Sequence, residues 1–81
     1  MKKFDFNNKL DWRNNLRNEL KGLGIDHATK ICERRGYTMM FNEDDMSRIE
    51  YVKFAAGVAY QMIVLLFSPK GRVRDIEFWQ A

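Results

Sequence analysis

Residues 58–79 read VAYQMIVLLFSPKGRVRDIEFW and contain the clearest secondary-structure pattern in the chain. Its first part, residues 58–67, is rich in β-branched and aromatic side chains, which is typical of a strand. The SPKG segment at residues 68–71 combines a proline that fixes one turn dihedral with a glycine that accepts a positive φ. Residues 72–79 are again strand-like. The sequence therefore predicts a C-terminal β-hairpin.

The second strand of this hairpin departs from regular alternation. Val73 and Ile76 are three residues apart, whereas Ile76 and Phe78 are two apart. A β-bulge near Arg74 and Asp75 would bring all three apolar side chains to one face. We therefore predict a bulged edge strand, which its charged residues protect from pairing with other chains.

Two further strands are expected upstream of the hairpin. Residues 37–41 are short and flanked by aromatic side chains, and residues 42–45 have turn chemistry. Residues 48–54 alternate in part, although residues 45–56 also fit a helical stripe. The crowding of Ile, Tyr, Val and Phe favours a strand there. Residues 55–57 would form the next turn.

The first half of the chain has helical periodicity. Apolar side chains recur at every fourth position between residues 12 and 20, which predicts a helix over residues 10–21 that ends at Gly22. A second short helix follows, with Asp26 as its expected N-cap and Gly36 as the residue that ends it.

The expected architecture is an α+β domain of order α-α-β-β-β-β. Two N-terminal helices would pack on one face of a four-stranded antiparallel meander. Residues 1–81 are expected to form a single small domain with a short N-terminal arm, residues 1–7. The lone cysteine allows no intrachain disulfide and suits a reducing compartment. Neither a signal peptide nor a membrane span is indicated, so a cytoplasmic protein without a membrane partner is expected.

Chemical groups for catalysis are scarce. His27 is the only histidine and Cys32 the only thiol, and their five-residue separation places them on different faces of a helix. Zinc needs about four nitrogen or sulfur ligands, and residues 43–45 lack the spacing of a calcium loop. A non-enzymatic protein with no cofactor and no metal site is therefore expected.

The strongest indication of function is a set of apolar side chains in the central strand. Residues 62–67 place hydrophobic side chains on both faces of one strand, and two short helices can cover only one face. An exposed patch of this kind is typical of an interface. The candidate interface residues are Tyr60, Met62, Val64, Leu66 and Trp79, or on the opposite face Ile63, Leu65 and Phe67. Alternatively, the sheet curls and the N-terminal arm folds over its second face through Phe4 and Phe6.

The function expected from this patch is that of a small interaction protein. It would form a homodimer, or act as a regulator or inhibitor that docks on a larger protein, as many proteins encoded by phages and other mobile elements do. Its partner would accordingly be another protein or a second copy of itself.

Nucleic-acid binding is the alternative. Residues 1–36 contain nine Lys and Arg against five Asp and Glu. Lys9, Arg13, Arg17 and Lys21 are four residues apart, which aligns them in one row along the first helix, where they could contact phosphates. Such a row is also the ordinary solvated face of an amphipathic helix.

A third possibility is a small toxin-like ribonuclease. Such folds also place two helices before a sheet and can cleave RNA without histidine. The candidate residues would be Tyr60, Lys70, Arg72 and Arg74. The N-terminal strand that those folds need is weak here, because the apolar pattern at residues 4–6 is short.

Overall fold

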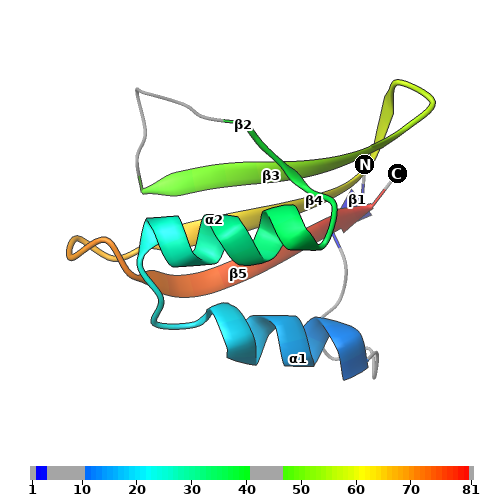
Figure 1. Cartoon of the computed structure of the whole chain (residues 1–81). Helices are drawn as coiled ribbons and strands as arrows, with labels where there is room; N and C mark the ends of the chain where they lie inside the picture. Colours follow the sequence, from blue (N-terminus) through cyan, green and yellow to red (C-terminus); the bar gives the residue numbers. More distant parts are fainter. Residues whose placement is uncertain (1, 4–10, 41–46, 81) are drawn as a thin grey trace.

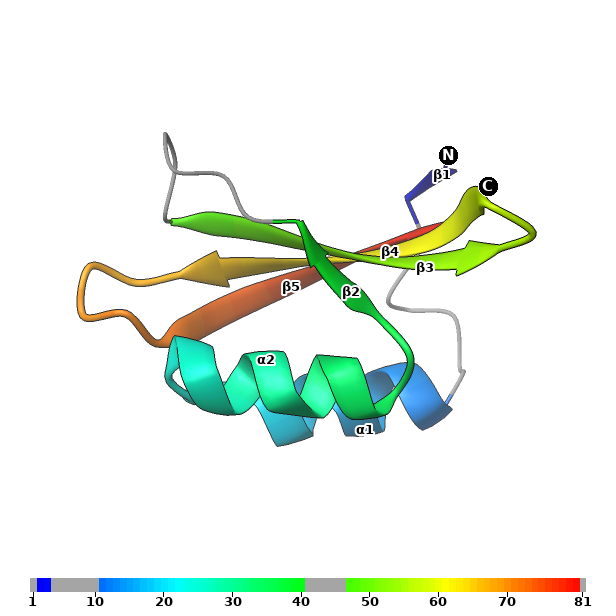
Figure 2. The ribbon, with the colours of Figure 1, turned by 45° about the horizontal axis from the view of Figure 1, so that its top comes forward.

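The computed structural model describes residues 2–3, 11–40 and 47–80. Both helices lie on one face of an antiparallel sheet, as Figures 1 and 2 show from two directions. The elements are β1 (Lys2–Lys3), α1 (Asp11–Leu20), α2 (Ile25–Arg34), β2 (Thr38–Met40), β3 (Arg48–Ala55), β4 (Val58–Phe67) and β5 (Val73–Gln80). The predicted order, two helices followed by a four-stranded meander β2-β3-β4-β5, is confirmed.

The sheet has a fifth strand that the sequence did not indicate. Strand β1 lies inside the predicted N-terminal arm and pairs antiparallel with the end of β5, Lys2 opposite Gln80 and Lys3 opposite Trp79. The complete strand order is β1-β5-β4-β3-β2. Strand β5 is therefore covered at its end and is not an edge over its whole length. Phe4 and Phe6 lie outside the described residues.

Strand β5 carries the predicted bulge. Leu66 pairs with Asp75 and Phe67 with Val73, which leaves Arg74 as the extra residue. As expected from the spacing, the apolar side chains at positions 73, 76 and 78 are all buried in the core beneath the helices. Residues 48–55 form a strand, so the helical interpretation of residues 45–56 is wrong for the part that is described.

The start of α2 differs from the prediction. Its N-cap is Gly24, with no side-chain cap, and Asp26 lies within the first turn, where a negative charge suits the helix dipole. Gly24 also forms an isolated β-bridge with Arg72, so a tertiary contact fixes where the helix begins. The predicted end is confirmed, because Gly36 has a φ of +90°. The Tyr37 N–H donates to the Cys32 carbonyl at 3.1 Å, as in a Schellman motif.

The core lies between the helices and the sheet. Its helical members are Leu16, Leu20, Ala28, Ile31 and Cys32, and its sheet members are Ile49, Tyr51, Ile63, Leu65, Phe67, Val73, Ile76 and Phe78, with Tyr37 between the layers. Strand β4 thus turns its odd-numbered residues towards the helices. The even-numbered set, which includes Met62, Val64 and Leu66, lies on the far face.

Hydrogen bonds across the layers attach the helices to the sheet. The Gly22 N–H donates to the Val73 carbonyl at 2.8 Å, and the Val73 N–H donates to the Leu23 carbonyl at 2.9 Å. Deeper in the domain, the hydroxyls of Thr29 on α2 and Tyr51 on β3 are 2.7 Å apart. The loop between the helices is therefore fastened to the first residue of β5.

Candidate functional site

The far face of the sheet is less open than predicted. Val64 is fully buried, although both helices lie on the other side. It is paired with Glu50 on β3 and Glu77 on β5, and Met62 and Leu66 are its neighbours along β4. These four longer side chains surround a short one on the same pleated face. The prediction that Val64 is exposed at an interface is therefore wrong.

The other predicted interface residues are partly exposed. Tyr60, Met62, Leu66 and Trp79 each keep some surface accessible to solvent. Met62 and Trp79 are cross-strand partners and lie near the end of the sheet where β3 and β4 join. The indole N–H of Trp79 is buried and has no acceptor among the described residues. At the other end of β4 the face is more polar, with an Arg48–Glu50 ion pair at 3.2 Å.

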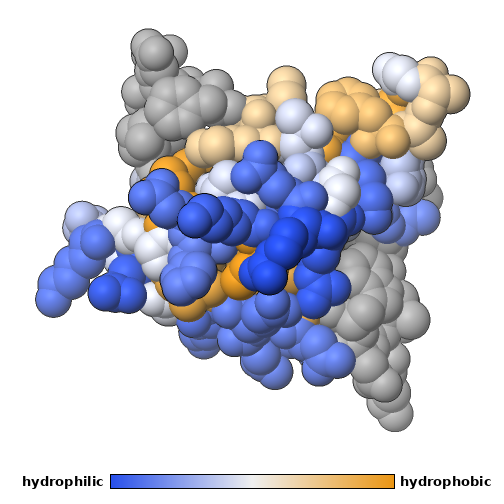
Figure 3. Space-filling model, in the orientation of Figure 1, coloured by the Kyte–Doolittle hydropathy of each residue, from blue (hydrophilic) through white to orange (hydrophobic). Residues whose placement is uncertain are grey.

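The β3–β4 hairpin has an apolar tip that sequence analysis treated only as a turn. Phe54 pairs with Ala59 and Ala55 with Val58, so the last two rungs contain no polar side chain. Phe54 is 48% exposed and Val58 is 65% exposed. In Figure 3 the hairpin forms the hydrophobic projection at the upper right. The signal was present in the sequence, because residues 54–59 read FAAGVA where hairpin turns are normally polar.

The base of this hairpin tip, residues 54–59, is held in place. Lys53, just before the tip, lies on the helix side of the sheet, with its ammonium 5.1 Å from the Tyr37 ring centroid. The Tyr37 hydroxyl donates to Oε1 of Gln61 at 3.2 Å, and Gln61 is the cross-strand partner of Lys53. The nearest charge is therefore drawn towards the helices and away from the tip.

The two residues of the turn both have positive φ, 51° at Ala56 and 78° at Gly57. This is the geometry of a type I′ turn, in which asparagine is well tolerated and alanine is strained. We expect Ala56→Asn to stabilise the domain by about 0.5–1 kcal/mol, measured as a higher urea midpoint at unchanged m-value. Ala55→Asn is the control and should bring no gain, because Ala55 lacks a positive φ. Equal effects of the two changes would contradict the turn assignment.

The basic row of the first helix is only partly described. The side chains of Lys9 and Arg13 lie outside the described part of the chain, whereas Arg17 and Lys21 are placed. Arg17 forms an ion pair with Asp75 of β5 at 3.3 Å, so it is directed towards the sheet. Lys21 is exposed. Of the two described residues in the row, Lys21 is a solvated cation that could contact a phosphate, whereas Arg17 is already paired.

The residues proposed for a ribonuclease are not brought together. Tyr60 lies near the β3–β4 turn, whereas Lys70 and Arg72 belong to the β4–β5 turn at the opposite end of β4. At about 3.3 Å per residue, the length of the strand separates them by more than about 20 Å.

The thiol of Cys32 and the imidazole of His27 also differ in their exposure to solvent. Cys32 is fully buried, and burial raises the pKa of its thiol to about 12, which opposes formation of a nucleophilic thiolate. His27 is exposed on the first turn of α2. Within the described residues, no group of three His, Cys, Asp or Glu side chains could hold a metal ion.

Comparison with protein-family models, curated proteins and solved structures gives no match to this chain. Neither of the described helices has the length and apolar character needed to cross a membrane. Function must therefore be inferred from the surface itself, where the apolar hairpin tip is the most unusual feature.

Proposed function

We propose that this chain is a small non-enzymatic interaction protein that binds a second copy of itself through the β3–β4 hairpin tip. The observation that carries the proposal is the exposure of Phe54 and Val58 in a turn without any polar side chain. A single exposed apolar residue is ordinary on a protein surface. Six consecutive apolar or glycine residues at a projecting turn are unusual on a protein surface. Such a patch is typical of a site that is covered by an apolar surface of a partner.

The tip continues into residues that the sequence already indicated. Phe54 lies on the same face of β3 as Val52, because side chains alternate along a strand. Val52 pairs with Met62, and Met62 pairs with Trp79, which makes a row of apolar residues across three strands. The proposed interface therefore comprises Phe54, Met62 and Trp79 on the far face, with Tyr60 at the register shift between them. Val58 pairs with Ala55 and extends the apolar surface around the tip to the other face, whereas Val64 and Leu66 are left outside the interface.

A second copy suits this surface on grounds of charge. The chain has a formal net charge of only +3, so repulsion between two copies is weak and is further screened by salt, and it opposes contact least where charged side chains are absent. The tip is such a place, because it contains no ionisable side chain and Lys53 is held over Tyr37 on the helix side. A two-fold contact buries the same apolar tip on both subunits.

The test is sedimentation equilibrium from about 1 to about 100 µM for the wild type and for the double variant Phe54→Thr/Val58→Thr. Threonine keeps the strand preference but loses most of the apolar area. The dissociation constant of the dimer should therefore rise at least about tenfold. Met40→Thr is the matched control, because Met40 is 46% exposed but belongs to β2. Far-UV circular dichroism checks that each variant is folded. A monomeric wild type, or a dimer that survives the double change, contradicts the proposal.

A further inference from the structure

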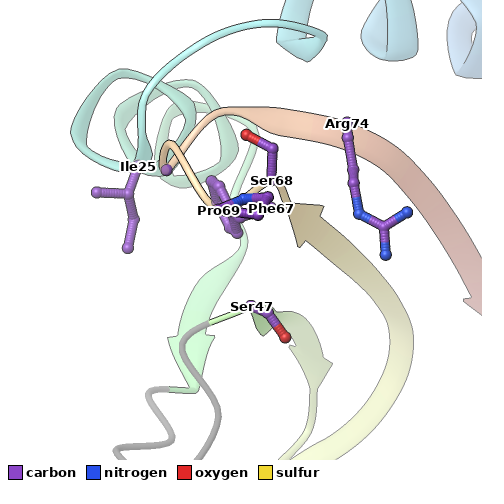
Figure 4. Close-up of a pocket in the computed structure, with 7 residues that line it drawn as sticks. Ile25, Ser47, Phe67, Ser68, Pro69 and Arg74 are labelled. Atoms are coloured by element: carbon purple, nitrogen blue, oxygen red, sulfur yellow. The ribbon is translucent and has the colours of Figure 1, made fainter.

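A second surface of the domain is a pocket at the opposite end of the sheet. It lies between the start of α2 and the β4–β5 turn, has a volume of about 740 Å³, and is shown in Figure 4. The described residues that line it are Ile25, Ser47, Phe67, Ser68, Pro69, Gly71 and Arg74. Its size falls within the range of small-molecule sites.

The walls of this pocket are mainly apolar, and Arg74 is the single charged residue among the described lining. In Figure 4, Ile25 stands on one side, Phe67 and Pro69 lie in the middle, and the Arg74 side chain descends from β5 on the other side. An apolar cavity with one charge at its rim is suited to a ligand that is itself apolar with one charged end.

The β-bulge determines the position of Arg74. As the extra residue between Val73 and Asp75, it has no cross-strand partner on β4. Bulges often redirect a side chain next to a binding site. Within the described part of the chain, no carboxylate pairs with Arg74, whereas Arg17 is paired with Asp75 and Arg72 donates to the Gly22 carbonyl at 3.0 Å.

The rim of the pocket is pre-organised by hydrogen bonds. The Ser68 N–H donates to the Arg72 carbonyl and the Gly71 N–H to the Ser68 carbonyl, each at 2.8 Å. The Ser68 hydroxyl accepts from the Arg72 N–H at 3.3 Å, so its own proton remains available for donation. A ligand therefore meets a turn that needs little ordering.

The charge around the pocket favours an anion. An adjoining groove shares Ile25 and Gly71 with it and is bordered by Lys30, Lys70 and Arg72, against Asp26 as the one carboxylate among its described residues. The pocket itself offers a single guanidinium, whose planar fork matches the two oxygens of a carboxylate.

From these observations we infer that the pocket binds a small organic acid: a carboxylate held by Arg74 and Ser68, with an aliphatic or aromatic group against Ile25, Phe67 and Pro69. The inference is independent of self-association, because the pocket and the hairpin tip lie at opposite ends of β4.

Octanoate is the probe for this site, and octanamide is its uncharged counterpart of the same shape. In amide NMR spectra of the whole chain, octanoate should shift the signals of residues 67–74 in a saturable way. Arg74→Gln should weaken octanoate binding at least about tenfold, which is the loss expected for a charged hydrogen bond, and should leave octanamide unchanged. Arg34→Gln is the control, because Arg34 is exposed on α2 away from the pocket lining.

Three results would overturn the assignment. Octanoate can fail to shift residues 67–74, or it can bind equally well to the Arg74→Gln variant. A short peptide with a free C-terminal carboxylate can also bind where octanoate does not, which would assign the pocket to a protein terminus and not to a small acid. The Arg74→Gln spectrum itself shows whether the variant is folded.

Discussion

Val64→Asp is expected to unfold the domain, whereas Val64→Lys is expected to be much less damaging. Val64 is fully buried between Glu50 and Glu77, its partners on the two neighbouring strands. An aspartate there buries a carboxylate next to two others, at a cost on the order of 4 kcal/mol. A lysine is also charged, but it meets two carboxylates and can extend its stem over Met62 to reach solvent.

Urea denaturation of the two variants measures this difference. Both substitutions introduce one charge at one position, so each serves as the control for the other. Equal losses of stability would mean that the two glutamates do not flank position 64, which would contradict the register of β3, β4 and β5. A stable aspartate variant would contradict the burial of Val64.

Alkaline pH is expected to destabilise the domain through Cys32. Burial raises the pKa of its thiol from 9.0 to about 12, with Arg35 acting weakly in the opposite direction. The unfolded chain therefore loses this proton more readily than the folded domain. The stabilisation from the protonated thiol is complete below about pH 9 and is lost progressively as the pH rises towards 12. At pH 11 the loss amounts to about 3 kcal/mol.

Tyr51 contributes in the same direction. Burial raises the pKa of its hydroxyl from 10.0 to about 12, and the hydrogen bond with Thr29 opposes the shift. Its share of the loss at pH 11 is about 1 kcal/mol, because its ordinary pKa is higher than that of the thiol.

Cys32→Ala separates the thiol from every other titrating group. At about pH 8 the variant should be less stable than the wild type by roughly 1 kcal/mol, because a buried side chain is shortened. At about pH 11 the order should reverse, since alanine has no proton to lose. Urea midpoints at the two pH values test this. Parallel pH profiles for the two proteins would show that the thiol is not desolvated.

Much of the fold follows from local patterns in the sequence. The bulge at Arg74 could be predicted because Val73, Ile76 and Phe78 must lie on one face to be buried. Their irregular spacing allows this only if one extra residue stands between Val73 and Ile76. The start of α2 could not be predicted in the same manner. Gly24 has no capping side chain, and its bridge to Arg72 is a contact between distant parts of the chain.

The exposure of the second sheet face was predicted correctly except at Val64, which is buried. The alternation of β4 correctly indicated a second apolar face, but the exposure of Val64 depends on which residues of β3 and β5 stand opposite it. Register is a property of the assembled sheet and cannot be read from one strand. Phe54 and Val58 were missed although their apolar turn is visible in the sequence, because the turn was interpreted only as a connection between two strands.

The attachment of the helical loop to β5 has a consequence for how the chain folds. The bonds between Gly22, Leu23 and Val73 join positions 50 or more residues apart. Contacts of such long sequence separation close large loops and form late, because the chain entropy must be lost before they contribute stability. The loop between the two helices is therefore expected to be fixed to the sheet only after the C-terminal hairpin exists. Amide hydrogens in that loop should be the last to acquire protection during refolding.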